Sequence, residues 1–146
     1  MDYGCAVGFL TKAINYLGIE CHGYDVSEWA ISYGKNEVTK DITNVFRYNQ
    51  EKTLICLDVL EHMSLKDVNS ILKLPYKKLI VRIPVEAKDN EGFYLEESKC
   101  DQTHITCMTK KRWEIFFREH GFVLMRKLHK KTIWDSKGVL SRIYVR

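Results

Sequence analysis

Proline, paired cysteines and long apolar runs are scarce or missing in this sequence. Only two prolines occur among 146 residues, and none of the five cysteines stands in a C-x-x-C pair. An odd number of widely spread cysteines argues against a disulfide framework and indicates reduced thiols, so we expect a cytoplasmic protein. No apolar run approaches the roughly 18 residues of a membrane-spanning helix, and the first residues lack the pattern of a secretory signal. We therefore expect no membrane association.

Length and composition are those of a globular domain. Hydrophobic residues make up 45% of the sequence and charged residues 29%, and 146 residues are enough to bury a hydrophobic core. We therefore expect a single domain over residues 1–146. The net charge of +4 is modest and does not by itself indicate a nucleic-acid partner.

Strand-like apolar segments alternate with helical ones along the chain. Strands are expected at 19–26, 53–59 and 78–85, and the last two are apolar enough for burial on both faces of a parallel sheet. Two further strands, at 122–128 and 139–145, are predicted to form a hairpin. This order predicts an α/β fold: a Rossmann-like, doubly wound, mostly parallel sheet with a C-terminal antiparallel hairpin.

Side-chain spacing and capping residues predict the helices. Apolar residues between Phe9 and Leu17 recur at helical spacing. Ser27, Ser64 and Thr109 each precede a helical pattern, and their hydroxyls can accept a hydrogen bond from the first turn.

Residues 86–103 form a polar stretch without helical or strand periodicity. The stretch is longer than the usual connection in an α/β domain. We expect it to be an irregular lid or an acceptor-binding loop.

The first ten residues, MDYGCAVGFL, predict a strand end followed by a tight turn into a helix. Gly4, Ala6 and Gly8 are small enough to let a ligand approach the backbone closely. The strand at 19–26 ends near Asp25, and the carboxyl ends of parallel strands meet at one edge of a sheet. A carboxylate there can accept hydrogen bonds from both hydroxyls of a ribose, so the two features together predict a nucleoside site. The alternative is a simple turn, with Asp25 capping the next helix.

The spacing of the small residues distinguishes two nucleoside cofactors. The dinucleotide fingerprint G-x-G-x-x-G would need a small residue at position 9, which is Phe. The segment DYGCAVG instead resembles the first motif of class I S-adenosylmethionine (SAM)-dependent methyltransferases, D-x-G-x-G-x-G, with Ala6 in the place of the middle glycine. Asp25 matches the acidic residue that ends the family's second strand. DVLEH (58–62) matches a stretch frequent in its small-molecule members, and residues 103–124 are similar to its later segment.

The resemblance implies SAM as the cofactor, with methyl transfer to a small-molecule acceptor at oxygen or carbon. It also implies a set of cofactor-binding residues: Asp2, Gly4, Cys5, Ala6, Gly8, Asp25, Val26, Asp41, Ile42 and Asp58. Asp41 and Ile42 stand where the family often places its adenine contacts.

Methyl transfer from a sulfonium is an in-line displacement, so the protein chiefly aligns nucleophile, methyl group and sulfur. A hydroxyl nucleophile also needs a general base, and His62 and His104 are the catalytic candidates. Each histidine could instead be structural, with His62 at the start of a helix and His104 packed beneath the loop. Cys100, His104 and Cys107 have poor spacing for zinc and lack a fourth ligand.

A catalytic mechanism assisted by a metal ion is an alternative. Four residues resemble the D/E-x-x-E-H ligand sets of ubiquinone-pathway and small-RNA 2′-O-methyltransferases and could hold Mg²⁺ or a transition metal: Asp58, Glu61, His62 and His104. Glu61 and His62 also occur in metal-free relatives, where they cap and pack. Our prediction therefore contains no metal.

The leading prediction is a SAM-dependent methyltransferase for a small-molecule acceptor, because 146 residues leave little room for a domain that reads a macromolecule. An RNA 2′-O-methyltransferase with a metal-assisted site is an alternative, favoured by the basic balance. A non-catalytic cofactor-binding subunit is another. We expect no nucleic-acid partner.

Only Met1 precedes Asp2, which is too little for the usual strand of about five or six residues before the turn. In the family fold this strand lies in the middle of the sheet, where unpaired backbone groups would each cost about 1–3 kcal/mol. We therefore predict a truncated first strand, in a shortened version of a longer gene product. The flanking strands would pair with each other, or a second copy would supply a strand and form a homodimer through the incomplete sheet.

Overall fold

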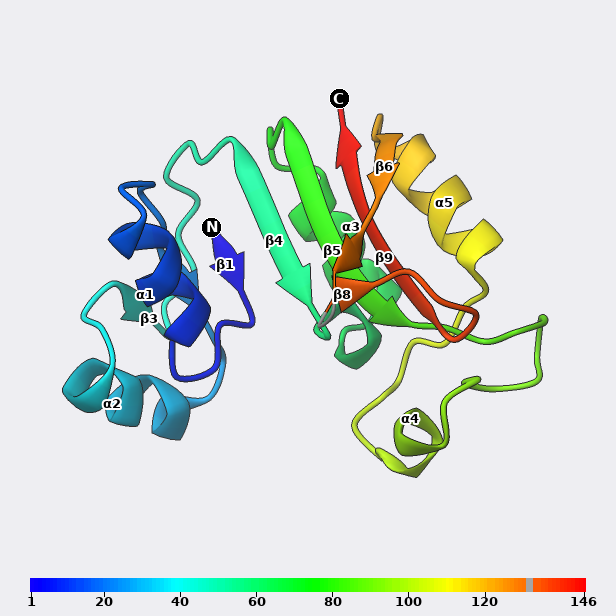
Figure 1. The fold of residues 1–146 in the computed structure, drawn as a ribbon, viewed down its shortest axis with the longest axis horizontal. Helices are drawn as coiled ribbons and strands as arrows, with labels where there is room; N and C mark the ends of the chain where they lie inside the picture. Colours follow the sequence, from blue (N-terminus) through cyan, green and yellow to red (C-terminus); the bar gives the residue numbers. More distant parts are fainter. Residues whose placement is uncertain (131–132) are drawn as a thin grey trace.

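The computed structural model describes residues 1–130 and 133–146 and shows a seven-stranded sheet with helices beside it (Figure 1). The strands are β1 (Asp2–Tyr3), β2 (Gly23–Tyr24), β3 (Ile42–Thr43), β4 (Thr53–Leu57), β5 (Lys78–Pro84), β6 (Val123–Lys127), β7 (His129–Lys130), β8 (Ile133–Trp134) and β9 (Val139–Val145). The helices are α1 (Phe9–Tyr16), α2 (Glu28–Glu37), α3 (Leu65–Leu72), α4 (Glu96–Cys100) and α5 (Lys110–Glu119), with a short 3₁₀ turn at Leu60–His62. In the described part of the chain, no helix is both long and apolar enough to cross a membrane.

The strands of the large sheet follow the order β3-β2-β1-β4-β5-β9-β6. Neighbours from β3 to β5 run parallel, whereas β9 runs antiparallel to both β5 and β6. The predicted α/β fold, with a mostly parallel sheet and a C-terminal antiparallel hairpin, is therefore confirmed. The short antiparallel pair β7-β8 lies between β6 and β9 in the chain and is not predicted by the sequence pattern.

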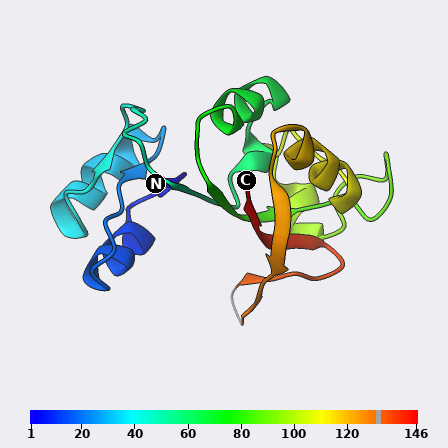
Figure 2. The same ribbon diagram turned by 90° about the horizontal axis from the view of Figure 1, so that it is seen from above.

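The main hydrophobic core lies between the longer strands and the helices α3 and α5, which share one face of the sheet (Figure 2). Its fully buried members include Leu54, Cys56, Val68, Leu72, Leu79, Val81, Ile83, Trp113 and Phe117. Alternate residues of β4 and β5 point into this core. Their opposite face is half-buried, since α1 and α2 lie over the other end of the sheet. The expected burial of both faces is therefore wrong.

All three predicted capping residues close the first turn of a helix. The Ser27 hydroxyl accepts a hydrogen bond from Ala30 N–H at 3.1 Å, and Ser64 and Thr109 do the same for α3 and α5. Each such contact stabilises a helix by about 1 kcal/mol. Local sequence therefore fixes these three helix starts.

Helix α1 confirms the predicted helix but exposes most of its apolar side chains. Phe9 is 68% and Tyr16 is 90% exposed, whereas Thr11 is fully buried. The Thr11 hydroxyl donates a hydrogen bond to the Asp2 carboxylate at 2.8 Å. The helix packs on β1 through this small polar side chain, because a strand of two residues cannot cover larger apolar ones.

The stretch 86–103 is not wholly irregular, because it contains α4. The stretch returns to the end of β5, where Tyr94 N–H donates a hydrogen bond to the Val85 carbonyl at 2.9 Å. The segment therefore folds over the carboxyl end of β5.

β1 lies in the interior of the sheet, between β2 and β4, although it is only two residues long. Asp2 pairs with Gly23 of β2 on one side and with Ile55 of β4 on the other. β2 and β4 therefore do not pair with each other, and this part of our prediction is wrong. Two residues keep the flanking strands apart because both edges of β1 are hydrogen-bonded. A strand donated by a second copy stays a prediction.

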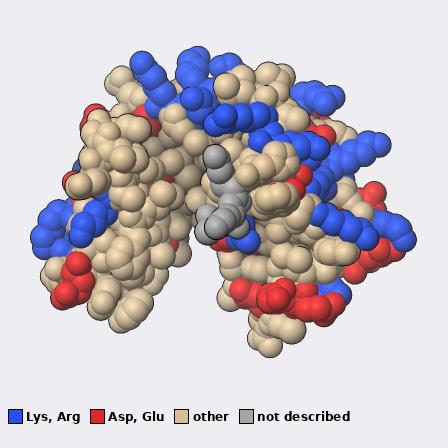
Figure 3. Space-filling model, in the orientation of Figure 1, with Lys and Arg blue, Asp and Glu red and all other residues tan. Residues whose placement is uncertain are grey.

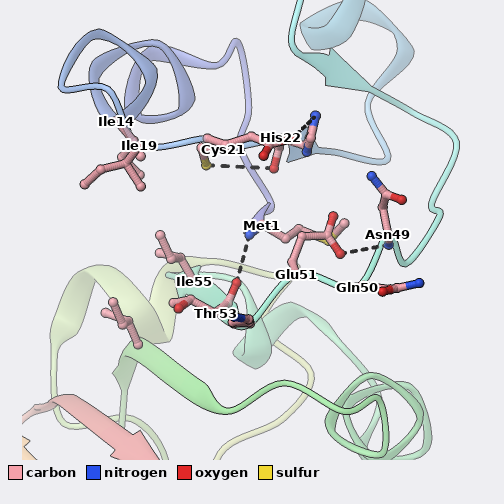
Figure 4. Close-up of a pocket in the computed structure, with 13 residues that line it drawn as sticks. Met1, Ile14, Ile19, Cys21, His22, Asn49, Gln50, Glu51, Thr53 and Ile55 are labelled. Atoms are coloured by element: carbon pink, nitrogen blue, oxygen red, sulfur yellow. Dashed lines mark hydrogen bonds and ion pairs between the residues drawn. The ribbon is translucent and has the colours of Figure 1, made fainter.

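An open slot continues from β1 toward the amino ends of β2 and β4. The Met1 amino group donates a hydrogen bond to the Thr53 carbonyl at 2.8 Å. Beside it lies a pocket of about 520 Å³ whose lining includes Met1, Cys21 and Thr53, with Ile14 and Ile55 as apolar walls (Figure 4). An extended segment placed there would pack against these apolar walls.

A chain extended before Met1 by five alternating valines and threonines should be more stable, because the extension can continue β1 through the slot. We expect the melting temperature, measured by circular dichroism, to rise by about 5 °C, the shift that roughly 2 kcal/mol gives a domain of this size. A control extension with proline at alternate positions lacks the N–H donors and should leave the melting temperature unchanged. Equal shifts in both extended chains would contradict strand docking.

Candidate functional site

The opening turn leads from β1 into α1 with left-handed backbone at three positions. Gly4 has a φ of +77°, Ala6 +47° and Gly8 +89°. Backbone N–H groups of Gly4 and Cys5 both donate to the Tyr24 carbonyl, at 2.7 and 2.9 Å. The tight turn predicted from the small residues is present, and it is anchored to the end of β2.

Space as well as backbone conformation demands glycine at both ends of the turn. A Cβ atom on Gly4 would lie 2.3 Å from a Val59 methyl group, and one on Gly8 would lie 2.8 Å from an Ile42 methyl group. Ile42 is itself buried with Cys5 and Ile31 in a small apolar cluster. The backbone of the turn is therefore held close to its neighbours.

The Asp25 carboxylate joins the turn to the start of α2. One oxygen accepts a hydrogen bond from Ala6 N–H at 2.8 Å, and the other accepts one from Ser27 N–H at 2.8 Å. Each carboxylate oxygen can accept a second hydrogen bond, so this pairing leaves capacity for a ligand. Val26, the next residue, is 77% exposed.

Two predicted cofactor residues lie beneath the turn. Asp2 is buried against Thr11, and burial raises the pKa of its carboxyl above the ordinary value. Burial also raises the pKa of the Cys5 thiol to about 12. Cys5 is therefore a neutral packing residue at neutral pH.

Asp41 and Ile42 are held at different places. The Asp41 carboxylate accepts hydrogen bonds from Asn15 Nδ2 at 3.0 Å and Thr39 Oγ1 at 3.1 Å, beside the amino end of β3. Ile42 packs against the turn. The structure thus brings the Ile42 side chain, but not that of Asp41, against the opening turn.

An aromatic cluster stands next to the turn and is not among the predicted site residues. The ring of Tyr3 lies 4.9 Å from that of Tyr24 and 5.6 Å from that of Phe46, between centroids. These rings border a pocket of about 510 Å³ that also reaches Val26 and His62. That volume lies in the range of small-molecule sites. The sequence feature that could have predicted this cluster is Tyr24, the tyrosine directly before Asp25.

The two candidate histidines lie together at the carboxyl end of β4. The ring centroids of His62 and His104 are 4.5 Å apart. His62 Nδ1 is 2.8 Å from the Thr103 hydroxyl, and His104 Nδ1 is 3.0 Å from the Ser98 carbonyl. The segment of residues 86–103 therefore orients both imidazoles, and its role as a lid or acceptor-binding loop stays a prediction.

Glu61 is fully buried beside the histidines, and neither carboxylate oxygen has a hydrogen-bond partner among the described residues. Ligand atoms of Glu61, His62 and His104 all lie within 4.8 Å of one another. This is the one metal-like group in the described part of the chain, and neither Cys100 nor Cys107 belongs to it. The donor set of one carboxylate and two imidazoles fits a divalent transition metal.

Asp58 lies at the end of β4 with a φ of +56°. Its carboxylate forms an ion pair with Arg82, and its N–H donates to the Arg82 carbonyl at 2.8 Å. Asp58 thus borders the histidine cluster on the side of β5.

Comparison with known proteins finds similar solved structures, whereas no family model and no curated protein sequence match this chain. A SAM-dependent methyltransferase from Archaeoglobus fulgidus has a TM-score of 0.72 at 14% identity, over 99% of this chain and 84% of that one. The methyltransferase domain of bacterial CtHen1 has a TM-score of 0.65 at 18% identity, and the match covers 99% of this chain and 88% of that one. Magnesium protoporphyrin IX methyltransferase from Synechocystis PCC 6803, with bound S-adenosylhomocysteine (SAH), has a TM-score of 0.69 at 19% identity, over 99% and 72%.

The chain therefore has the fold of SAM-dependent methyltransferases. The resemblance seen in the opening motif extends to the whole architecture. The small-molecule subgroup and the individual site residues stay predictions.

Glu61→Gln should make the stability of the ligand-free protein less dependent on pH. Burial raises the pKa of the Glu61 carboxyl from 4.5 to about 8. Between these values the folded chain keeps a proton that the unfolded chain has released, so stability falls as pH rises, by up to about 1.4 kcal/mol per unit. The free energy of unfolding of the variant should therefore rise relative to that of the parent chain as the pH increases from about 5 to 8.

Denaturant unfolding at several pH values, with a chelator present, checks this prediction. The exposed Glu119→Gln is the matched control and should follow the parent chain. If Glu61→Gln also follows the parent chain, the carboxyl is not buried as described.

Proposed function

We propose that this chain transfers a methyl group from SAM to an oxygen or carbon atom of a small-molecule acceptor. The observation that carries the proposal is the Asp25 carboxylate, fixed by Ala6 and Ser27 N–H groups directly beside the opening turn. A ribose-binding carboxylate needs this position, at the carboxyl edge of a parallel sheet next to a turn of small residues. The methyltransferase fold of the solved neighbours supports it.

The other predicted cofactor-binding residues lie at or near the same carboxyl edge of the sheet. The backbone at Gly4, Ala6 and Gly8 faces the cofactor in this proposal, with Val26 on the side of the aromatic pocket and Asp58 on the side of the histidines. Asp2, Cys5 and Ile42 support the turn from below, and Asp41 braces the strand that carries Ile42. The faces of Tyr3, Tyr24 and Phe46 suit the adenine ring, since aromatic rings stack on nucleobases.

SAM supplies an electrophilic methyl group on a sulfonium, and the chain supplies alignment and a base. The C–S bond breaks as the acceptor atom forms its bond to the methyl carbon, which leaves SAH. A hydroxyl acceptor loses its proton in this step, and His104 or His62 accepts that proton. Their bonds to Ser98 and Thr103 hold the imidazoles in place.

A metal-assisted RNA 2′-O-methyltransferase is the second candidate. The close approach of Glu61, His62 and His104 and the unsatisfied carboxylate of Glu61 favour it. A divalent ion held by these three residues would polarise the acceptor hydroxyl. The resemblance of CtHen1 in fold is compatible with this candidate.

Asp25→Ala should weaken SAH binding by about 1–3 kcal/mol, because ribose hydroxyls lose a charged acceptor. Isothermal titration calorimetry measures the affinity, and circular dichroism verifies that the variant is folded. Glu20→Ala is the matched control, because Glu20 is exposed near the opposite end of β2. Unchanged affinity in Asp25→Ala would contradict the cofactor assignment.

His104→Ala should lower turnover by roughly 10²–10⁴ if His104 is the general base. The assay uses labelled SAM and a panel of small hydroxyl acceptors. Cys100→Ala, an exposed position of α4, is the control and should keep the parent rate. Activity that is lost with a chelator and restored by Mg²⁺ or Mn²⁺ would favour the second candidate, and an unchanged rate in His104→Ala would exclude this histidine as the base.

A further inference from the structure

A pocket on the far side of the histidines carries an excess of carboxylates. It has a volume of about 490 Å³, and none of its lining residues comes from the opening turn. The acidic side chains that line it are Asp58, Glu61, Glu97 and Asp101, against one arginine, Arg82. Arg82 is already paired with Asp58. Asp101 accepts hydrogen bonds from Thr103 and lies 3.4 Å from His104 Nε2, whereas Glu61 and Glu97 have no lysine, arginine or histidine partner among the described residues.

Glu61 gives this pocket an unsatisfied buried group. Its side chain is fully buried, and both oxygens lack a hydrogen-bond partner among the described residues. Because a buried carboxyl group without a partner is costly whether or not it keeps its proton, Glu61 points to a ligand that donates hydrogen bonds.

The loop over the pocket has the same sign of charge. Residues 86–103 contain six acidic and two basic side chains, although the whole chain has a net charge of +4. Both lysines of the loop are paired within it, Lys88 with Glu91 and Lys99 with Glu96. Figure 3 shows acidic side chains gathered at the lower right, where α4 lies, and many lysines and arginines along the upper edge.

We propose that this pocket anchors a positively charged group, an ammonium or guanidinium, of a small organic acceptor. The inference rests on the proposed function and names the chemical class of its substrate. Pro84, Leu95 and Val139 form an apolar wall for the hydrocarbon part of the acceptor. On the other walls, Glu97 and Asp101 receive the cation through charge-assisted hydrogen bonds, and Glu61 accepts a further hydrogen bond from it.

The cation in the pocket is an anchor and not the methylated group. An ammonium or guanidinium lacks the free electron pair that attack on the methyl carbon requires. The nucleophile is therefore a second group of the same molecule, such as a hydroxyl, and its proton passes to His104 or His62. A polyanion such as RNA would bring phosphates beside an acidic pocket and an acidic loop, which is unfavourable.

Three phenols that share one hydroxyl but differ in charge test the inference. They are tyramine, 4-ethylphenol and 3-(4-hydroxyphenyl)propionate, and calorimetry measures their binding to the chain saturated with SAH, without metal. We expect tyramine to bind at least about tenfold more tightly than the neutral phenol, and the acid more weakly still. Glu61→Gln combined with Glu97→Gln should remove the preference for tyramine, whereas the distant Glu119→Gln should keep it.

The same titrations separate failure of this inference from failure of the proposed function. If SAH does not bind, the proposed function is wrong. If SAH binds but the three phenols bind alike, or if the acid binds best, the cationic anchor is wrong. If Mg²⁺ or Mn²⁺ binds in a Glu61-dependent way and displaces tyramine, the pocket holds a metal and the inference is overturned.

Discussion

The hydrogen bonds on the two edges of β1 hold the sheet together between β2 and β4. Asp2 N–H donates to the His22 carbonyl and Ile55 N–H to the Met1 carbonyl, both at 2.9 Å. A strand of two residues suffices because the pairing continues beyond it, through the Met1 amino group on one side and through Gly4 N–H on the other. The turn that faces the proposed cofactor is therefore also part of the join between β2 and β4. Changes in the turn should be felt in the stability of the sheet as well as in binding.

Asp25, at the end of β2, also serves both the structure and the proposed cofactor site. Its carboxylate fixes the distance between the turn, through Ala6, and the start of α2, through Ser27. Because α2 also approaches the turn closely, with Gly34 beneath the Val7 carbonyl, the loop has little freedom once this carboxylate is in place. A preorganised loop loses less conformational entropy when a ligand binds, which lowers the cost of recognising a nucleoside.

The features that could be predicted from the sequence are those that local residues determine. The caps at Ser27, Ser64 and Thr109 and the long strands β4 and β5 depend on nearby residues. The length of β2, in contrast, does not depend on nearby residues alone. Residues 19–26 have strand character, yet only Gly23–Tyr24 pair as a strand, because the length of a strand is limited by its partner, and β1 offers two residues. The exposed apolar face of α1 has the same cause. The aromatic cluster joins three separate segments, so only the register of the sheet creates it.

Net charge is a poor guide to what this candidate site attracts, because salt screens charges beyond about 8–10 Å. Most of the positive charge lies outside the loop of residues 86–103, while the pocket is lined by carboxylates. The local charge therefore favours a cation, whatever the sign of the whole chain. An ammonium and a divalent metal could each be the missing partner of the buried Glu61 side chain, but they have opposite consequences for the acceptor. A bound metal would neutralise the carboxylates and allow a phosphate to approach, whereas an ammonium would keep the pocket selective for small cationic molecules. The occupant of the Glu61 carboxylate thus decides between the two candidate functions.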